Sequence, residues 1–294
     1  MSTRIRVAVC TNRGAVEVAE CVAALGAQLG GAPLAIVTSG LPEAVAERHR
    51  ASFDGEVLVE PRPGLSRARN RALAWTPDGE VLAFVDDDAV VAEGWWGALS
   101  RRWDEAPPEV ACIGGPIRPR FAAAPPPWFS DAIAPALTVL DRGHEVRELD
   151  PSVEAVYGAN ISFRADPLRQ VGGFDPAFGH AGSNAYFGEE NEAQLALARL
   201  GRWIRYVPDA SVWHVIPHAR MRRGSFLRRR FAFGASLGAR GGRSRAVAAR
   251  QALSSAAGCV AAAAQGDERL LMERAVRAAE SAGVVGGRLV ARAR

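Results

Sequence analysis

The chain has 294 residues, 48% of them hydrophobic, which excludes a disordered protein and provides enough apolar side chains for one large α/β domain or two small ones. Its four cysteines lie far apart and form no C-x-x-C pair, which argues against a zinc knuckle or a disulfide framework and favours a reducing cytoplasm. The sequence has no signal-peptide pattern and no run of roughly 18 apolar residues, so we expect no membrane span.

The charge is unevenly distributed, although the formal net charge is only +4. Residues 210–266 contain ten arginines and no acidic residue, which leaves 26 basic against 32 acidic residues in the rest of the chain. Such a cluster favours a surface for phosphates, anionic lipid or nucleic acid. We expect peripheral contact with an anionic membrane or an anionic acceptor. A nucleic-acid partner is not expected, because the cluster lacks interleaved aromatic side chains.

The first 90 residues alternate between predicted strands and predicted helices. Apolar runs predict strands at residues 4–10, 34–37, 57–59 and 81–85, and helical spacing predicts helices at residues 14–29 and 66–75. This order indicates right-handed crossovers and a parallel sheet that is covered on both faces. Ligands bind such sheets at the carboxyl ends of the strands.

Beyond residue 90 the pattern is less regular. The predicted elements are strands at residues 110–113, 161–163, 203–207 and 210–215, a helix that buries Trp96, Leu99 and Trp103, and a helix from Glu189 to Gly201. The proline-rich segment at residues 119–135 is predicted to be an irregular loop that lines an acceptor site. We expect one domain over residues 1–218 and an arginine-rich helical extension over residues 219–294.

Three aspartates directly follow the predicted strand at residues 81–85. Alone, Asp86-Asp87-Asp88 is more often a solvated strand end or a helix cap than a metal site. However, Thr11-Asn12-Arg13 and Thr38-Ser39 would emerge at the same edge of the sheet. Mg²⁺ is usually held by one or two carboxylates together with substrate phosphates. These clusters therefore predict one site for a phosphate-bearing ligand.

Seven short motifs, in the same order along residues 5–215, resemble those of family 2 glycosyltransferases, enzymes with the nucleotide-diphospho-sugar transferase fold known as GT-A. They are Val9-Cys10-Thr11-Asn12-Arg13, Gly64-Leu65-Ser66-Arg67-Ala68-Arg69-Asn70, Phe84-Val85-Asp86-Asp87-Asp88, Gly158-Ala159-Asn160-Ile161-Ser162-Phe163-Arg164, Val171-Gly172-Gly173-Phe174-Asp175, Gly188-Glu189-Glu190, and Tyr206-Val207-Pro208-Asp209-Ala210 with Val212-Trp213-His214. The resemblance implies a three-layer α/β/α fold with a mostly parallel sheet, followed here by the helical C-terminal extension. It also implies transfer of a sugar from a nucleotide diphosphate donor to a hydroxyl acceptor.

The resemblance assigns a metal site to the aspartate triplet. Asp86 and Asp88 match the family's D-x-D pair, and the implied cofactor is Mn²⁺ or Mg²⁺, which would stabilise the diphosphate leaving group as a Lewis acid. Asp88 would be the direct ligand, and Asp86 would hold the ribose or a water of the metal. His214 would make a second contact to the metal or the diphosphate, although a lone histidine is more often structural.

The family resemblance also implies a catalytic base. Inverting transfer requires a base that deprotonates the acceptor hydroxyl as it attacks the anomeric carbon. Glu190 is the first choice, and Glu189 remains the alternative, because the family usually has Glu-Asp where this chain has Glu-Glu. Acidic residues also gather at helix starts for purely electrostatic reasons.

The remaining predicted site residues concern the nucleotide, the donor sugar and the acceptor. For the nucleotide sugar they are Thr11, Asn12, Arg13, Thr38, Ser39, Arg69, Asp86, Asp87, Gly158 and Asn160, with a purely structural role as the alternative for Asp87. Val37-Thr38-Ser39-Gly40 departs from the family, which commonly has an aspartate there, so UDP is only the default nucleotide. The predicted acceptor residues are Trp128, Gly173 and Phe174. Ordinary tight turns are the alternative for the glycines.

Other functions stay open at this point. The same fold also supports retaining transferases and nucleotidyltransferases. An arginine-rich module that binds nucleic acid or an anionic surface is the non-enzymatic alternative. If the chain is a transferase, the acceptor is a natural product, a glycan or a lipid-linked molecule.

Overall fold

The structure is a computed structural model that describes residues 2–178, 180–181, 184–185, 188–239 and 244–291. The chain divides into two compact units. Unit 1 contains Met1–Pro119, Leu140–Gly182 and Gly188–Val215, and unit 2 contains Arg120–Val139, Ser183–Phe187 and Ile216–Arg294. Most of the proline-rich segment therefore belongs to the same unit as the C-terminal helices.

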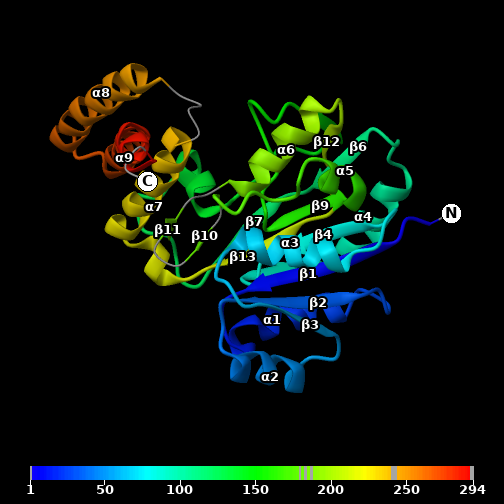
Figure 1. The fold of residues 1–294 in the computed structure, drawn as a ribbon. Coiled ribbons are helices and arrows are strands. Elements are labelled where there is room, and N and C mark those ends of the chain that lie inside the picture. Colours follow the sequence, from blue (N-terminus) through cyan, green and yellow to red (C-terminus); the bar gives the residue numbers. More distant parts are fainter. Residues whose placement is uncertain (1, 179, 182–183, 186–187, 240–243, 292–294) are drawn as a thin grey trace. The chain divides into compact units, whose positions relative to one another are not determined.

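The described residues of unit 1 form a central eight-stranded sheet with the order β3-β2-β1-β4-β9-β6-β12-β8 (Figure 1). Its strands are β1 (Ile5–Thr11), β2 (Leu34–Ser39), β3 (Glu56–Glu60), β4 (Val81–Val85), β6 (Val110–Gly114), β8 (Arg147–Leu149), β9 (Asn160–Arg164) and β12 (Trp203–Tyr206). The first four strands run parallel, because a helix returns the chain to the same edge each time. β9 is antiparallel to both β4 and β6, and β8 is antiparallel to β12.

The helices of unit 1 connect and cover these strands. They are α1 (Ala15–Gly26), α2 (Glu43–Ser52), α3 (Leu65–Trp75), α4 (Trp95–Asp104), α5 (Ala165–Gln170) and α6 (Glu189–Arg199). Glycines with positive φ precede two helices that matter below: φ is 142° at Gly64 before α3 and 92° at Gly188 before α6. Residues with a side chain rarely adopt such values, so glycine allows the sharp turn into each helix.

A smaller sheet has the order β5-β13-β7, and its strand β5 directly follows the aspartate triplet in the sequence. Its strands are β5 (Ala89–Val91), β7 (Ile117–Phe121) and β13 (Val212–Ile216), and the remaining described strands are the two-residue β10 (His180–Ala181) and β11 (Asn184–Ala185). β13 pairs antiparallel with β5, so that His214 lies opposite Ala89. This pairing brings a histidine from late in the sequence next to the end of β4.

The predicted strands and helices are confirmed, but several further elements were not predicted. Among them are β5, β7 and β8, and the segment at residues 119–135, predicted to be an irregular loop, contains the end of β7 and the start of a 3-10 helix at Asp131–Leu137. α2 was not predicted, because its ten residues are mostly polar and only Ala46 and His49 are buried. In α4 the fully buried tryptophan is Trp95, whereas Trp96 is half-buried; the helix begins at Trp95, and its inward face continues through Leu99 to Trp103. The sheet itself is mixed, and its parallel half carries the strand ends on which the site prediction depends.

Unit 2 is helical, as predicted for the C-terminal extension. Its elements are α7 (Arg223–Ala239), α8 (Arg245–Ala264), α9 (Glu268–Ala291) and the 3-10 helices η1 (Asp131–Leu137) and η2 (His218–Met221). Its core consists of Trp128, Ile133, Leu137, Ile216, Met221, Phe226, Met272 and Val276. Backbones of α7 and α9 touch, since a Cβ added at Gly234 or Gly238 would overlap a carbonyl oxygen of α9. None of the described helices is both long and apolar enough to cross a membrane.

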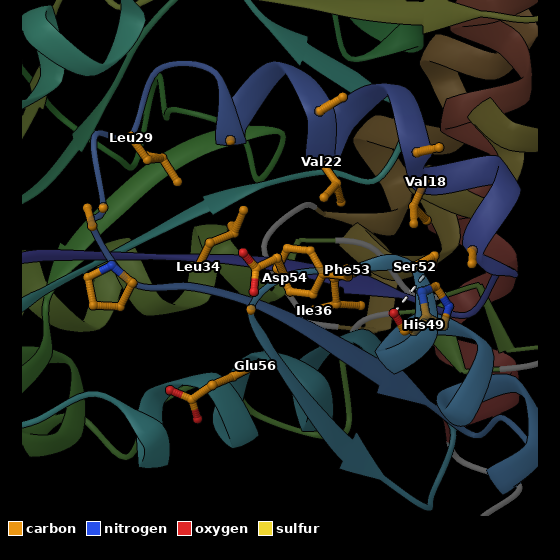
Figure 2. Close-up of a pocket in the computed structure, with 18 of the residues that line it drawn as sticks. Val18, Val22, Leu29, Leu34, Ile36, His49, Ser52, Phe53, Asp54 and Glu56 are labelled. Atoms are coloured by element: carbon orange, nitrogen blue, oxygen red, sulfur yellow. Dashed lines mark hydrogen bonds between the residues drawn. The ribbon is translucent and has the colours of Figure 1, made fainter.

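An apolar pocket of about 990 Å³ lies between α1 and β2 and extends to α2 (Figure 2). Its lining is mainly apolar and includes Val18, Val22, Leu34, Ile36 and Phe53. At one end, the buried His49 Nε2 lies 3.0 Å from the carbonyl oxygen of Arg13. A carbonyl oxygen only accepts hydrogen bonds, so Nε2 carries the proton and ties α2 to the loop after β1. No residue that lines this pocket is a predicted site residue.

Candidate active site

The carboxyl ends of three parallel strands meet at one edge of the central sheet. β1 ends at Thr11, β2 ends at Ser39, and Asp86 follows β4. Thr11 pairs with Thr38 across β1 and β2, and β4 pairs with β1 on its other side. Polar clusters that are far apart in the sequence are therefore neighbours here.

Arg13 connects the loop after β1 with the aspartate triplet. Its Nη2 lies 3.2 Å from Asp88 Oδ2 and its Nε lies 3.6 Å from Asp87 Oδ2, while 37% of the side chain is exposed. Thr11 Oγ1 donates to Asp87 Oδ2 at 2.6 Å and accepts from the backbone N–H of Arg13 at 3.0 Å. Asp87 and the buried Thr11 thus hold each other, and Asn12 is exposed beside them.

Asp88 and His214 meet at the end of β4. His214 Nε2 lies 3.3 Å from Asp88 Oδ1, and both side chains are largely buried. The backbone N–H of Val215 donates to the carbonyl oxygen of Asp88 at 2.8 Å, which fixes β13 against the triplet. The structure therefore brings these two predicted metal-site residues together, with Asp86 two residues away on the same turn.

The donor set at this turn fits a divalent cation that takes further ligands from its substrate. Within the described part of the chain, no three His, Cys, Asp or Glu side chains are arranged to hold a metal ion by themselves. Carboxylate oxygens suit Mg²⁺ and Mn²⁺, and Mg²⁺ commonly binds through one or two carboxylates plus phosphate oxygens. Asp88 and His214, with Asp86 nearby, satisfy that weaker requirement.

Thr38 and Ser39 lie at the predicted edge, but their hydroxyl groups are used by the protein. Thr38 Oγ1 donates to the carbonyl oxygen of Leu58 at 3.4 Å. Ser39 Oγ accepts from the N–H of Gly64 at 3.0 Å and lies within donating distance of the carbonyl oxygens of Arg62 and Gly64. Both side chains are buried; the Ser39 hydroxyl anchors the turn before α3, and the Thr38 hydroxyl is bound to β3.

Arg69 was predicted to contact the nucleotide, yet it lies in the interior, with a side chain that is only 2% exposed. Its Nη1 lies 2.6 Å from Glu189 Oε1 and 3.8 Å from Glu190 Oε2, and its Nη2 lies 3.5 Å from Asp86 Oδ1. Its guanidinium carbon lies 5.5 Å from the ring centre of Phe84. The helix-start carboxylates and the aspartate triplet are therefore joined by one buried cation.

Gly158 and Asn160 also belong to the interior. A Cβ added at Gly158 would overlap Nη2 of Arg69, so the guanidinium packs directly on this backbone. Asn160 Oδ1 accepts from Trp95 Nε1 at 3.0 Å, and its Nδ2 donates to the carbonyl oxygens of Pro116 and Ala210. The Asn160 side chain is buried and hydrogen-bonded by the protein at both ends, rather than open to a nucleotide sugar.

The three predicted acceptor residues are divided between the two units, with Gly173 and Phe174 in unit 1 and Trp128 in unit 2. Phe174 is buried, and its ring packs edge-to-face against Phe84 and Phe163 in the core of unit 1. Gly173 has φ 72°, and a Cβ there would collide with Asn70 Oδ1. Trp128 is buried in unit 2, with its ring centre 5.7 Å from that of Phe226. For Phe174 and Trp128 the structure therefore shows packing roles.

The surroundings of Asp86 and Arg69 shift the pKa values of both side chains. Burial raises the pKa of the Asp86 carboxyl group to about 6; Arg69 opposes this rise, whereas the carboxylates of Asp88 and Asp87 add to it. Burial lowers the pKa of the Arg69 guanidinium, but Glu189, Asp86 and Glu190 outweigh burial and raise it. Arg69 is therefore a permanent cation among three carboxyl groups.

Two residues that position the site were not predicted. His49 binds the backbone of Arg13, as described above. Gln194 on α6 is fully buried; its Oε1 accepts from the N–H of Val156, and its Nε2 donates to the carbonyl oxygens of Val156 and Glu190. No motif marks Gln194, and only its position one turn after Glu190 could have drawn attention to it.

The chain is similar to two curated proteins. The chain is 30% identical over 154 residues to the glucosyl-dolichyl phosphate glucuronosyltransferase of Haloferax volcanii, covering 51% of this chain and 47% of that protein. It is 27% identical over 194 residues to the succinoglycan biosynthesis protein ExoM of Rhizobium meliloti, covering 65% of this chain and 57% of that protein. The chain thus spans about half the length of the curated relatives it matches.

Solved structures show the same fold. GalNAc-T7, crystallised with UDP, GalNAc and Mn²⁺, superposes with a TM-score of 0.54 at 14% identity, covering 81% of this chain and 50% of that one. S. aureus TarS 1-349 superposes with a TM-score of 0.52 at 14% identity, covering 94% of this chain and 90% of that one. The model of the family described as Glycosyl transferase family 2 matches residues 7–172, more than half of the chain. This protein, with its GT-A fold, therefore belongs to glycosyl transferase family 2.

Proposed function

We propose that this protein is a metal-dependent inverting glycosyltransferase that moves a sugar from a nucleotide diphosphate donor to a hydroxyl-bearing acceptor. The observation that carries the proposal is the contact of Asp88 with His214 at the edge of the sheet, a short distance along the chain from Asp86, which Arg69 links to Glu189 and Glu190. One group of residues thus supplies ligands for a diphosphate-bound cation and the other supplies carboxylates. We assign this chemistry to residues 1–218.

Asp88 and His214, with support from Asp86, would hold Mn²⁺ or Mg²⁺. The ion would supply Lewis-acid stabilisation of the charge that develops on the diphosphate. Glu190 accepts the proton of the acceptor hydroxyl as its oxygen bonds to the anomeric carbon, and the bond from that carbon to the diphosphate breaks with its electron pair leaving on the phosphate oxygen. Attack from the face opposite the diphosphate inverts the anomeric centre.

The substrates are proposed by chemistry and by analogy. UDP is the default nucleotide, and the UDP and Mn²⁺ bound to GalNAc-T7 support this choice. The names of the two curated relatives favour a lipid-linked phosphate or a glycan as acceptor, with a natural product as the further option. Asn12 and Arg13, which are not buried, are the proposed nucleotide contacts.

We also propose that unit 2 gives a cytoplasmic protein peripheral contact with an anionic membrane. Leu253 and Val260 on α8 are 74% and 72% exposed, and Arg245 and Arg250 lie on the same helix. An apolar helix face flanked by arginines is typical of a helix that lies on anionic lipid. Flotation with anionic vesicles would test this attachment, and no binding there would contradict it.

A thermal-shift panel tests the central proposal. Nucleotide diphosphates and nucleotide sugars would be added with and without Mn²⁺ to the wild type, to Asp88→Asn, and to Asp150→Asn, an exposed turn aspartate that serves as the matched control. We expect a metal-dependent rise of the melting temperature in the wild type and the control, and none in Asp88→Asn. If no nucleotide diphosphate stabilises the wild type, the proposal fails.

Product analysis separates the remaining alternatives. The anomeric configuration of the product distinguishes inversion from retention. Release of pyrophosphate would identify a nucleotidyltransferase instead. Steeply salt-dependent DNA binding without metal-dependent nucleotide binding would favour a nucleic-acid module.

A further inference from the structure

Arg69 is placed where a substrate-binding arginine would not be. Its side chain is 2% exposed, whereas Asp86, one of its partners, is 34% exposed. The ring of Phe174 also lies against the guanidinium, with 5.7 Å between the guanidinium carbon and the ring centre. A cation enclosed by aromatic rings and protein carboxylates is not available to a diphosphate. Arg69 must therefore affect the reaction through the residues that it contacts.

Arg69 lies at different distances from the two glutamates at the start of α6. Glu189 is 3% exposed and makes the short contact of 2.6 Å, so it is the buried counter-ion. Glu190 is 16% exposed and lies 3.8 Å from the same nitrogen, beyond hydrogen-bond distance. A buried charge is strongly destabilising when its partner is removed, which keeps Glu189 on Arg69. Of the two carboxylates, Glu190 is the more exposed to solvent.

The backbone around this cation is fixed from two sides. Gly158 has no side chain, and the guanidinium packs on its Cα. Two residues earlier, the N–H and carbonyl of Val156 are both bound by Gln194, which also donates to the carbonyl oxygen of Glu190 at 3.0 Å. The segment that contains Gly158 and the start of α6 are therefore held in one arrangement, with Arg69 between them.

We propose that Arg69 is a positioning residue: it holds Glu189 as a buried counter-ion so that Glu190 serves as the base, and it links this pair to Asp86 on the donor side. The inference rests on the proposed function, because it assigns roles within that same site. Gly158 is a second positioning residue, which leaves room for the guanidinium.

The test compares variants of the full chain in two assays. Calorimetry with UDP and Mn²⁺ measures donor-side binding, and release of UDP from a UDP-sugar, with water as the acceptor, measures turnover. The variants are Arg69→Lys and the double variant Arg69→Met with Glu189→Gln, which removes both buried charges together and so avoids an unpaired one. Arg164→Lys is the matched control, because Arg164 is a half-buried arginine whose guanidinium donates to the backbone carbonyls of Val110 and Ala106 and lies over the ring of Trp103.

We expect both Arg69 variants to bind UDP and Mn²⁺ as the wild type does and to lose turnover by about 100-fold, the cost of a misplaced catalytic group. The control should keep its turnover even if its melting temperature falls. A loss of UDP affinity as large as the loss of turnover would overturn the inference and make Arg69 a donor-binding residue. Turnover equal to that of Arg164→Lys would overturn it as well.

A second measurement keeps the inference independent of activity. Gly158→Ala should lower the melting temperature clearly in the wild-type background, and by less than half as much in the Arg69→Met, Glu189→Gln background, where the space is free. Equal shifts in both backgrounds would contradict the packing on which the inference depends. A wild type that binds no nucleotide diphosphate with Mn²⁺ and releases none from a nucleotide sugar would refute the proposed function, whereas Arg69 variants as active as the wild type would refute this inference alone.

Discussion

Two arginines contact the carboxylates of this site, and their surroundings differ sharply. Arg13 is 37% exposed and reaches Asp87 and Asp88 from a loop. Arg69 is 2% exposed and is enclosed by Glu189, Asp86 and aromatic rings. An exposed ion pair is weak and can exchange its partner for a ligand, whereas a buried pair cannot be opened without a large penalty. The comparison separates an adaptable side, where we propose that the donor binds, from a rigid side, which carries the proposed base.

The largest effect is expected at the base. Glu190→Gln keeps the shape of the side chain but removes the proton acceptor, so turnover should fall by about 10²–10⁴-fold. Binding of UDP with Mn²⁺ should not change, since Asp88 and His214 are intact. Release of UDP and calorimetry measure the two quantities, and full activity in Glu190→Gln would move the base to another residue.

Removing Arg69 from its buried ion pair should destabilise the folded protein strongly. Arg69→Met leaves Glu189 buried without its partner, and we expect a loss of about 3–5 kcal/mol in the free energy of unfolding. Urea denaturation would measure it, with Arg164→Met as the control for the loss of a half-buried arginine. A loss below that of the control would show that the buried pair contributes little.

Removing the exposed Arg13 should change the stability of the folded protein much less. Arg13→Gln removes an exposed cation, and we expect a change of about 0–1 kcal/mol in the free energy of unfolding. If Arg13 and Arg69 variants are equally destabilised, the proposed contrast between the two sides is wrong. The same urea titrations provide both values.

The last prediction concerns the pH dependence of stability. The pKa of Asp86 is raised to about 6 in the folded protein, whereas an aspartate in an unfolded chain has a pKa of about 3.9. Folding therefore favours the protonated form, and this contribution to stability is present below about pH 4 and is lost as the pH rises to 6. In metal-free buffer, the melting temperature of Asp86→Asn relative to the wild type should increase between pH 4 and pH 6 and then level off. A constant difference over this range would contradict the raised pKa.

Much of the fold could be predicted because widely buried strands and helices have a regular pattern of hydrophobic residues. The run Val81–Val85 is buried at every position, and it was predicted with the bounds that β4 has. α2 was missed because its polar sequence hides a narrow inward face formed by Ala46 and His49. The pattern of hydrophobic residues thus locates elements that are buried widely and overlooks those buried along one line.

The site could be predicted only in part, because polarity does not distinguish an inward from an outward role. Asp88 and His214 were expected together and are together. Arg69 and Asn160 are polar residues in recognisable motifs and were predicted to touch the nucleotide sugar, yet both are buried and bound by protein groups. Their direction depends on contacts with residues far away in the sequence, such as Glu189 and Ala210. Periodicity along the chain carries no information about such contacts.

The close approach of Gly158 to Arg69 also restricts how this sequence can diverge. In a lineage that first gained a side chain at position 158, the guanidinium or the backbone would have to shift, because an added Cβ overlaps Nη2 of Arg69. A lineage that first replaced the arginine by a smaller residue would make position 158 free to change. The arginine must therefore be replaced before the glycine can change. Relatives with a residue larger than glycine at this position should lack the arginine.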